Sequence, residues 1–207
     1  PNKLKDVGID KYHKNLDVVS GDLLQAETIR PALEGVNIVY HIAGFISTAP
    51  KDRKQVYKLN VDITKNLFEA CDENLIEKIV YLASIFALAG GGRESTTEST
   101  PYNLEKLNVD YVKAKREAEL YSWEKYENGL PIVFVYPCFC YGPGDVYNSS
   151  TQILLSFVKK QLPAYIPGGQ NVMDVRDAAN GLILGMDKGQ IGERYIVGGS
   201  NKNYAAM

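Results

Sequence analysis

Short apolar segments alternate with longer amphipathic segments along most of the chain. The short segments are rich in β-branched residues and are bounded by Gly, Asp, Ser or Pro, which is typical of strands. They span residues 16–19, 37–41, 78–83, 132–136 and 195–197. The run Ile132-Val133-Phe134-Val135 has no polar position, as expected for a strand that is covered on both faces of a parallel sheet.

The longer segments carry apolar residues at helical spacing. They predict helices over residues 25–34, 53–74, 104–128, 150–160 and 175–187. Gly35 follows the first of these segments, and Asn128-Gly129 stands just before Pro131 at the end of the longest, as is typical of helix C-termini. The alternation of strand and helix predicts an α/β fold with a doubly wound parallel sheet.

Composition narrows the class of protein mainly by exclusion. The 207 residues are 45% hydrophobic and 23% charged, which excludes intrinsic disorder and collagen-like structure. Lys and Arg total 23 against 25 for Asp and Glu, so no field of one sign favours nucleic acid or an anionic membrane, and a small-molecule partner is expected. There is no bilayer-spanning apolar stretch, no leader pattern and no disulfide framework, so we predict a cytoplasmic protein.

Two side chains in the segment 104–128 form a candidate chemical pair. Tyr111 and Lys115 are four residues apart, so they lie on one face of the predicted helix. A nearby cation favours the phenolate, and it would bring a phenol pKa of about 10 toward the working range. Taken alone, the pair is more typical of a solvated helix face, because such pairs are common. Ser84 ends a predicted buried strand, and in doubly wound sheets the carboxyl ends of the strands face the ligand.

Further short motifs occur in a fixed order along nearly the whole chain. They are Gly21-Asp22-Leu23, His41-Ile42-Ala43-Gly44, Asn60-Val61, Ser84, Tyr111 with Lys115, Tyr141-Gly142-Pro143-Gly144-Asp145, Asp174-Val175-Arg176-Asp177-Ala178-Ala179 and Gly192-Glu193-Arg194-Tyr195. In this order the chain resembles the extended short-chain dehydrogenases/reductases, which form the NAD-dependent epimerase/dehydratase family. Within that family it is most similar to the dihydroflavonol 4-reductase-like enzymes and the hopanoid-associated sugar epimerases.

The resemblance implies a Rossmann-type fold that lacks its first βαβ unit. Residues 1–148 and 170–207 would form the NAD(P)-binding domain, and residues 149–169 would form part of a small substrate-binding lobe. The glycine-rich turn that holds the pyrophosphate in this fold is not in the sequence, so we expect the natural chain to continue N-terminally. By the same resemblance, a homodimer is expected to form through the helices over residues 53–74 and 104–128.

The resemblance also assigns roles to single residues. Tyr111 would exchange a proton with a substrate carbonyl or alcohol, Lys115 would lower the pKa of Tyr111 and hold the nicotinamide ribose, and Ser84 would hydrogen-bond the substrate oxygen. The alternative for Ser84 is a cap at the end of its strand. The residues implied in contact with NAD or NADP are Asp22, Leu23, Ile42, Ala43, Gly44, Asn60, Tyr111, Lys115, Pro137 and Cys140.

Several of these residues have a second interpretation. Asp22 would contact the adenine or cap the following helix, and both roles are compatible. Asn60 is a relay or packing residue in the family's pattern, or else a helix-surface amide. Cys140 is either a reactive thiol or an inert packing residue in an apolar run. His41 has no Cys, Asp or Glu at ligand spacing, so it is expected to be a structural histidine, and no metal site is predicted.

The function expected from these residues is an NAD(P)-dependent oxidoreductase that reduces a carbonyl group. The alternatives are an NAD-dependent nucleotide-sugar epimerase and a non-catalytic nucleotide-binding sensor. A dehydratase is disfavoured, because Ile85 and Phe86 stand after Ser84 where dehydratases of this family carry acids. The substrate is therefore expected to be a small carbonyl compound or a nucleotide sugar, and the choice between NAD and NADP stays open.

Overall fold

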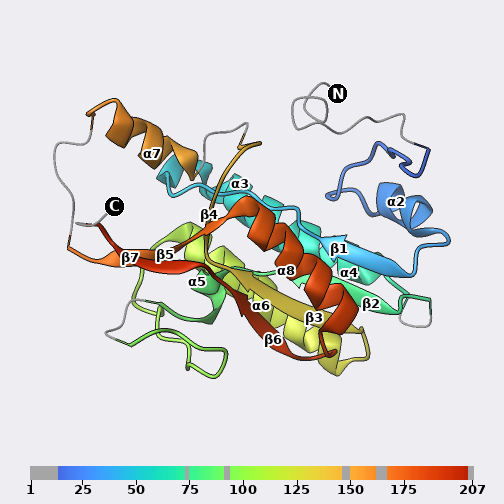
Figure 1. Cartoon of the computed structure of the whole chain (residues 1–207). Helices are drawn as coiled ribbons and strands as arrows, with labels where there is room; N and C mark the ends of the chain where they lie inside the picture. Colours follow the sequence, from blue (N-terminus) through green and yellow to red (C-terminus); the bar gives the residue numbers. More distant parts are fainter. Residues whose placement is uncertain (1–13, 73–74, 91–93, 146–149, 162–166, 205–207) are drawn as a thin grey trace. The chain divides into compact units, whose positions relative to one another are not determined.

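The computed structural model describes residues 14–72, 75–90, 94–145, 150–161 and 167–204 (Figure 1). The chain divides into two units. The larger unit comprises Gly21–Pro137 and Asn180–Val197. The smaller unit comprises Pro1–Ser20, Cys138–Ala179 and Gly198–Met207.

A four-stranded parallel sheet forms the centre of the larger unit. Its strands are β1 (Ile38–His41), β2 (Lys78–Leu82), β3 (Ile132–Pro137) and β6 (Arg194–Val197). They lie in the order β1-β2-β3-β6, and every neighbouring pair is parallel. Each strand agrees within one residue at either end with a segment predicted from the apolar pattern. The prediction of a parallel α/β sheet is confirmed.

The predicted strand over residues 16–19 is wrong. These residues form no ladder with any strand in the described part of the chain, and Leu16, Val18 and Val19 are all exposed. Within the sheet, β1 pairs only with β2. A β-branched apolar run becomes a strand only where a neighbour supplies hydrogen-bond partners and covers its side chains. Here neither condition is met.

Helices connect the strands of the larger unit. They are α2 (Ala26–Ile29), continued by a 3-10 turn η1 (Arg30–Leu33), a 3-10 turn η2 (Pro50–Asp52), α3 (Arg53–Tyr57), a π-helical turn η3 (Lys58–Asp62), α4 (Ile63–Ala70), α5 (Ile85–Leu88), α6 (Asp110–Glu127) and the later part of α8 (Val175–Lys188). The helix predicted over residues 53–74 is therefore interrupted by a π turn. The helix predicted over residues 104–128 begins only at Asp110.

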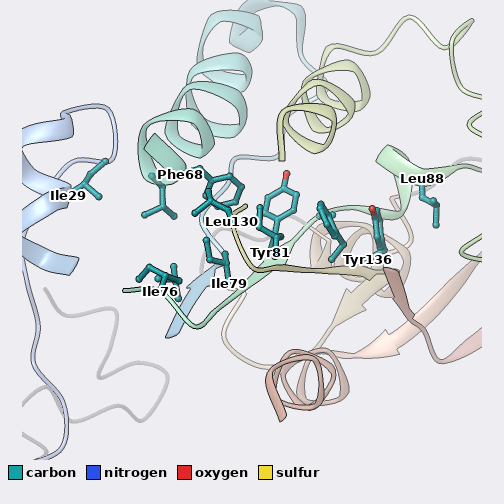
Figure 2. Close-up of a cluster of buried hydrophobic side chains, with 13 residues drawn as sticks. Ile29, Phe68, Ile76, Ile79, Tyr81, Leu88, Leu130 and Tyr136 are labelled. Atoms are coloured by element: carbon teal, nitrogen blue, oxygen red, sulfur yellow. The ribbon is translucent and has the colours of Figure 1, made fainter. Parts of the chain in front are cut away.

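Alternate residues of the central strands face two different helical layers. On one face, Tyr81 of β2 and Phe134 of β3 belong to a buried cluster that includes Phe68 of α4, and Trp123 of α6 packs against it. Figure 2 shows this cluster, which is the main core of the unit. On the other face, Val133 and its neighbours pack against Leu182 of α8. Helices thus cover both faces, as the doubly wound prediction requires.

The smaller unit contains a second sheet, which the apolar pattern did not reveal. Its strands are β4 (Phe139–Tyr141), β5 (Gly169–Asp174) and β7 (Ser200–Asn203). β4 is parallel to β5, and β5 is antiparallel to β7. The residues of β7 are all exposed, so no hydrophobic alternation marks that strand. Backbone hydrogen bonds and a Tyr141–Gln170 side-chain bond of 2.5 Å hold this sheet together.

The same unit includes α7 (Thr151–Val158), which confirms the helix predicted over residues 150–160. Residues 149 and 162–166 of the predicted substrate lobe lie outside the described residues, and the role of that segment stays a prediction. None of the helices in the described ranges is both long and apolar enough to cross a membrane.

Candidate active site

Ser84 follows directly after the carboxyl end of β2. Its backbone is still extended, with φ −150° and ψ 144°, and its Oγ accepts a hydrogen bond of 3.3 Å from the backbone N–H of Phe86. Ser84 therefore caps the single turn of α5, which was the alternative interpretation of this residue. The cap uses only acceptor capacity of the hydroxyl group. The hydroxyl proton of Ser84 is left to donate elsewhere.

Tyr111 lies in the first turn of α6, against the residues that follow Ser84. Its ring meets that of Phe86 edge to face, with centroids 6.5 Å apart and planes at 86°. Burial raises the pKa of the Tyr111 phenol, and a hydrogen-bonding interaction with the Ser84 side chain acts in the opposite direction. The structure thus brings Ser84 and Tyr111 together as the sequence predicted.

Lys115 lies one helical turn after Tyr111 and is only 7% exposed. Its Nζ donates a hydrogen bond of 3.2 Å to the carbonyl oxygen of Leu82, at the end of β2, and lies 5.7 Å from the centroid of the Tyr81 ring. Burial lowers the pKa of the ammonium group to about 8. We expected Lys115 to lower the pKa of Tyr111. The pKa of Tyr111 is nevertheless raised overall, because burial of the phenol outweighs the hydrogen-bonding interaction with Ser84, and the effect of Lys115 on it stays a prediction.

The turn after β1 is the predicted contact for the cofactor. Ile42, Ala43 and Gly44 are all exposed there. A Cβ atom on Gly44 would lie 3.0 Å from Asn60 Oδ1, a tight contact that glycine avoids, so the backbone packs closely against Asn60 here. The three residues offer small or apolar surface, over which a flat ring could approach the backbone.

Asn60 anchors that turn from the π-helical turn η3. Its Nδ2 donates to the carbonyl oxygens of Phe45 and Val56, both at 2.8 Å, and its Oδ1 accepts from the Phe45 N–H at 3.3 Å. Asn60 is 3% exposed, which excludes the helix-surface amide and leaves the packing or relay interpretation. A π turn shifts the following residues relative to an α-helix, and such turns are frequent at functional sites.

His41 is a buried structural histidine, as predicted. Its Nε2 lies 2.8 Å from Thr64 Oγ1, and Thr64 donates its only hydroxyl proton to the Asn60 carbonyl oxygen at 2.7 Å. Nε2 of His41 must therefore be the donor, and with the lowered pKa the ring is neutral at pH 7 with its proton on that nitrogen. Burial, reinforced by the charge of Lys115, lowers the pKa of His41 to about 3.

Three further predicted cofactor contacts, Asp22, Leu23 and Pro137, lie before α2 and at the end of β3. Asp22 is exposed, and its Oδ1 accepts a hydrogen bond of 2.9 Å from the N–H of Leu24, so it closes a turn before α2 instead of capping the helix directly. The carbonyl oxygen of Leu23 accepts from Asn66 Nδ2 at 2.9 Å. Pro137 is the last residue of β3 in the larger unit.

Cys140 belongs to β4 of the smaller unit. Burial raises the pKa of its thiol to about 11, and its Sγ lies 3.4 Å from the carbonyl oxygen of Cys138. A thiol that stays protonated is a weak nucleophile, so these observations favour the packing interpretation over the reactive one.

Glu119 of α6 is a buried carboxylate that was not predicted from the sequence. The side chain is 0% exposed and accepts hydrogen bonds from Tyr136 Oη at 2.8 Å, from Trp123 Nε1 at 3.1 Å and from Arg116, while Arg194 lies 3.4 Å away. The signal that could have revealed it is its spacing, since it continues the four-residue periodicity of the Tyr–Lys pair on the buried face of α6.

The parallel α/β sheet is of the type that binds nucleotides at the carboxyl ends of its strands. Ser84, Tyr111 and Lys115 lie at that end of the central strand β2, and this combination defines a class of protein. Residues 3–198 match the NAD dependent epimerase/dehydratase family, and the chain belongs to that family. The family and the fold class expected from the sequence are thereby confirmed. Its members are nicotinamide-dependent enzymes, so an enzyme is supported.

Individual relatives agree with this assignment. The chain is 34% identical over 192 residues to a protein of Synechocystis sp. named "Putative dihydroflavonol 4-reductase", covering 90% of this chain and 56% of the relative. It is 26% identical to cinnamoyl-CoA reductase 1 of Petunia hybrida over 193 residues, covering 88% of this chain and 57% of the relative. The chain thus spans little more than half the length of these relatives.

Solved structures show the same fold. The crystal structure of gox2253 superposes with a TM-score of 0.86 at 33% identity, covering 94% of this chain and 60% of that one. The UDP-glucuronic acid 4-epimerase of Bacillus cereus, in complex with UDP-glucuronic acid and NAD, superposes with a TM-score of 0.80 at 19% identity, covering 98% of this chain and 66% of that one. At 19% identity the likeness to the epimerase concerns the fold.

Proposed function

We propose that the protein is an NAD(P)-dependent reductase of carbonyl compounds in which Tyr111 donates the proton. The observation that carries the proposal is the arrangement of three groups: the half-buried phenol of Tyr111, the buried Ser84 hydroxyl that interacts with it, and the buried ammonium of Lys115 one helical turn away. The raised pKa of Tyr111 keeps the phenol protonated at neutral pH, which is the form that a proton donor needs.

The residues around these groups fit a nicotinamide dinucleotide. Lys115 has three N–H donors, and in the described part of the chain one of them is used, by the Leu82 carbonyl oxygen. The other donors suit ribose hydroxyl groups. The turn Ile42–Gly44 is exposed and free of large polar side chains, and the Asp22 carboxylate has an oxygen left to accept from an exocyclic amine. A Cβ atom at position 44 would lie 3.0 Å from Asn60 Oδ1, so a side chain there would press on the residue that anchors this turn.

The chain's own residues divide the work of reduction between them. When bound, the nicotinamide dinucleotide supplies the hydride. Tyr111 transfers its phenolic proton to the carbonyl oxygen of the substrate, and Ser84 donates a hydrogen bond to the same oxygen. The ammonium of Lys115 stabilises the phenolate that remains, and solvent returns the proton. No metal ion is needed in this scheme, because the two donors carry the developing charge.

A reductase is favoured over the other enzymes of the family by the apolar residues that follow Ser84. Ile85 packs against the main core, and Phe86 lies edge-on to Tyr111, so no carboxylate stands beside the phenol from this segment. Elimination of water from a sugar needs such an acid or base. The likeness to the Synechocystis and Petunia relatives, both named as reductases, supports the same reading.

The test uses the full-length natural protein and the variant Tyr111→Phe. Titration with NADH and NADPH by fluorescence gives the preferred cofactor, and a panel of aryl and alkyl ketones is then screened by loss of absorbance of the reduced cofactor. Tyr111→Phe is expected to bind the cofactor like the wild type and to lose about 10²–10⁴-fold in kcat. The matched control is Tyr121→Phe, at a partly buried tyrosine of the same helix whose hydroxyl donates to Glu69, away from Ser84 and Lys115.

The outcomes separate the alternatives. Interconversion of a UDP-sugar without net consumption of cofactor would identify an epimerase. Cofactor binding without turnover of any substrate would point to a non-catalytic sensor. Near wild-type turnover by Tyr111→Phe would refute the proposed role of the phenol.

A further inference from the structure

The short helix α5 carries the residues that place Ser84 and Phe86 beside Tyr111. It is a single turn, so most of its backbone N–H and C=O groups have no hydrogen-bond partner within the helix and need partners outside it. At the N-terminal end, Ser84 Oγ accepts from the N–H of Phe86. At the C-terminal end, the carbonyl oxygen of Ala87 accepts a hydrogen bond of 3.1 Å from the guanidinium of Arg116.

Arg116 belongs to α6, directly after Lys115, and its guanidinium is itself held from two further sides. The same NH1 group donates to the buried carboxylate of Glu119, and the guanidinium carbon lies 4.4 Å from the centroid of the Tyr102 ring. A planar guanidinium with several fixed partners has little rotational freedom. It therefore acts as a rigid link between α5 and α6.

The Arg116 guanidinium is held in place by a hydrogen bond to Glu119. Its Oε1 accepts from Tyr136 of β3 and from Trp123, one turn further along α6, while its other oxygen accepts from Arg116. The carboxylate is completely buried, so it cannot exchange these partners for water. The position of the Ala87 carbonyl group is thereby tied to the central sheet through two side chains.

We propose that Arg116 is a positioning residue for the reaction, because it holds α5 against α6 and so fixes Ser84 relative to Tyr111. This inference rests on the function proposed above. Within the described residues, the contacts found for the Arg116 guanidinium are with Ala87, Glu119 and Tyr102, none of which is a predicted site residue, so its effect is transmitted through the backbone of α5. The interaction of Ser84 with the phenol is the quantity that Arg116 controls.

A neighbouring arginine provides a matched control. Arg194 of β6 also lies against Glu119, at 3.4 Å, and its guanidinium carbon is 4.6 Å from the centroid of the Trp123 ring. The interactions found for Arg194 in the described residues join it to Glu119 and Trp123 and not to α5. Loss of Arg194 thus removes a cation from the same carboxylate without releasing the Ala87 carbonyl group.

The experiment measures the pKa of the phenol at position 111 without any need for a substrate. 3-Fluorotyrosine is incorporated at this position alone in the full-length protein, because the fluorine lowers the phenol pKa to an accessible range, and the residue is titrated by fluorine NMR. Ser84→Ala removes the favourable interaction and is expected to raise the pKa. Arg116→Met is expected to raise it by about half as much or more, Arg116→Lys much less, and Arg194→Met not at all.

Each result decides between the proposal and its failure. The proposal is overturned if Arg116→Met leaves the pKa at the wild-type value while Ser84→Ala raises it, or if Arg194→Met raises it equally. It is also overturned if Ser84→Ala has no effect. Should Arg116→Met fail to fold, Arg116→Gln takes its place under the same criteria. A failure of the proposed reduction itself would show separately, as retained turnover in Tyr111→Phe.

Discussion

Replacing Lys115 by Met is predicted to stabilise the protein while abolishing its activity. Burial lowers the pKa of Lys115 from the ordinary 10.5 to about 8. At about 1.4 kcal/mol for each pKa unit, the folded state loses about 3 kcal/mol by keeping this ammonium charged at neutral pH. Met fills a similar volume without charge. Loss of the bond to the Leu82 carbonyl oxygen costs about 1 kcal/mol, which leaves a net gain of about 2 kcal/mol.

The pH dependence of this gain follows from the direction of the shift. Between pH 8 and pH 10.5 the unfolded chain binds more protons at Lys115 than the folded chain, so the stability of the wild type rises with pH in this window. Below pH 8 both states are protonated and the cost is constant. The advantage of Lys115→Met should therefore be largest below pH 8 and should shrink by up to about 1.4 kcal/mol per pH unit above it.

Urea unfolding at a series of pH values between about 6.5 and 9.5 measures this difference. Trp123 is the only tryptophan, and it stacks on Phe134 in the main core, so its fluorescence reports unfolding of the larger unit. Circular dichroism must give the same transition before a free energy is taken from it. Lys113→Met removes an exposed ammonium of the same helix and should change the stability by no more than about 0.5 kcal/mol.

The reasoning is refuted if Lys115→Met lowers the free energy of unfolding at pH 7. It is equally refuted if the difference from the wild type is the same at pH 7 and at pH 9.5. Either result would mean that the ammonium is solvated in the folded protein, or that its hydrogen bond outweighs its burial.

Three further predictions concern the buried polar groups. Because the pKa of His41 is lowered to about 3, the unfolded state binds more protons than the folded state below pH 6.5. The free energy of unfolding should therefore fall on acidification by up to about 1.4 kcal/mol per pH unit. Urea unfolding should show a weaker dependence on acid in His41→Gln. Glu119→Gln leaves two cations facing a neutral amide and should cost about 3 kcal/mol, measured as a lower thermal midpoint. Asn60→Ala should cost about 2 kcal/mol and weaken NADH binding, because the turn after β1 loses its anchor; unchanged binding would contradict this.

The central strands β2 and β3 were predictable because they are buried on both faces, so that apolar residues mark them almost without interruption. The segment 16–19 has the same local signature and forms no strand, since the pattern cannot show whether a neighbour is present. The strand β7 is the opposite case, since it is present in the structure without any apolar pattern in the sequence. Its side chains are exposed, and only its backbone hydrogen bonds to β5 define it.

The candidate site was predictable to a similar degree. Helical spacing was enough to put Tyr111 and Lys115 on one face, and the end of a strand was enough to find Ser84. The direction of the Tyr111 pKa was missed, because it depends on how deeply α6 packs, which spacing alone does not show. Glu119 was missed because a charged residue on a helix is ordinarily solvated. Its burial depends on contacts with Arg116, Trp123, Tyr136 and Arg194, and the last two lie on other elements of the fold.

The π-helical turn at Lys58–Asp62 has a consequence for how the chain tolerates changes of length. A π turn holds one residue more than an α-helical turn. Deletion of one residue there would therefore leave a continuous α-helix with regular backbone geometry. The helix would nevertheless rotate by about 100° on one side of the deletion. Asn60 would then no longer reach Phe45 while Thr64 still faced His41. A length change that leaves the fold intact would thus disconnect the turn after β1 from the core.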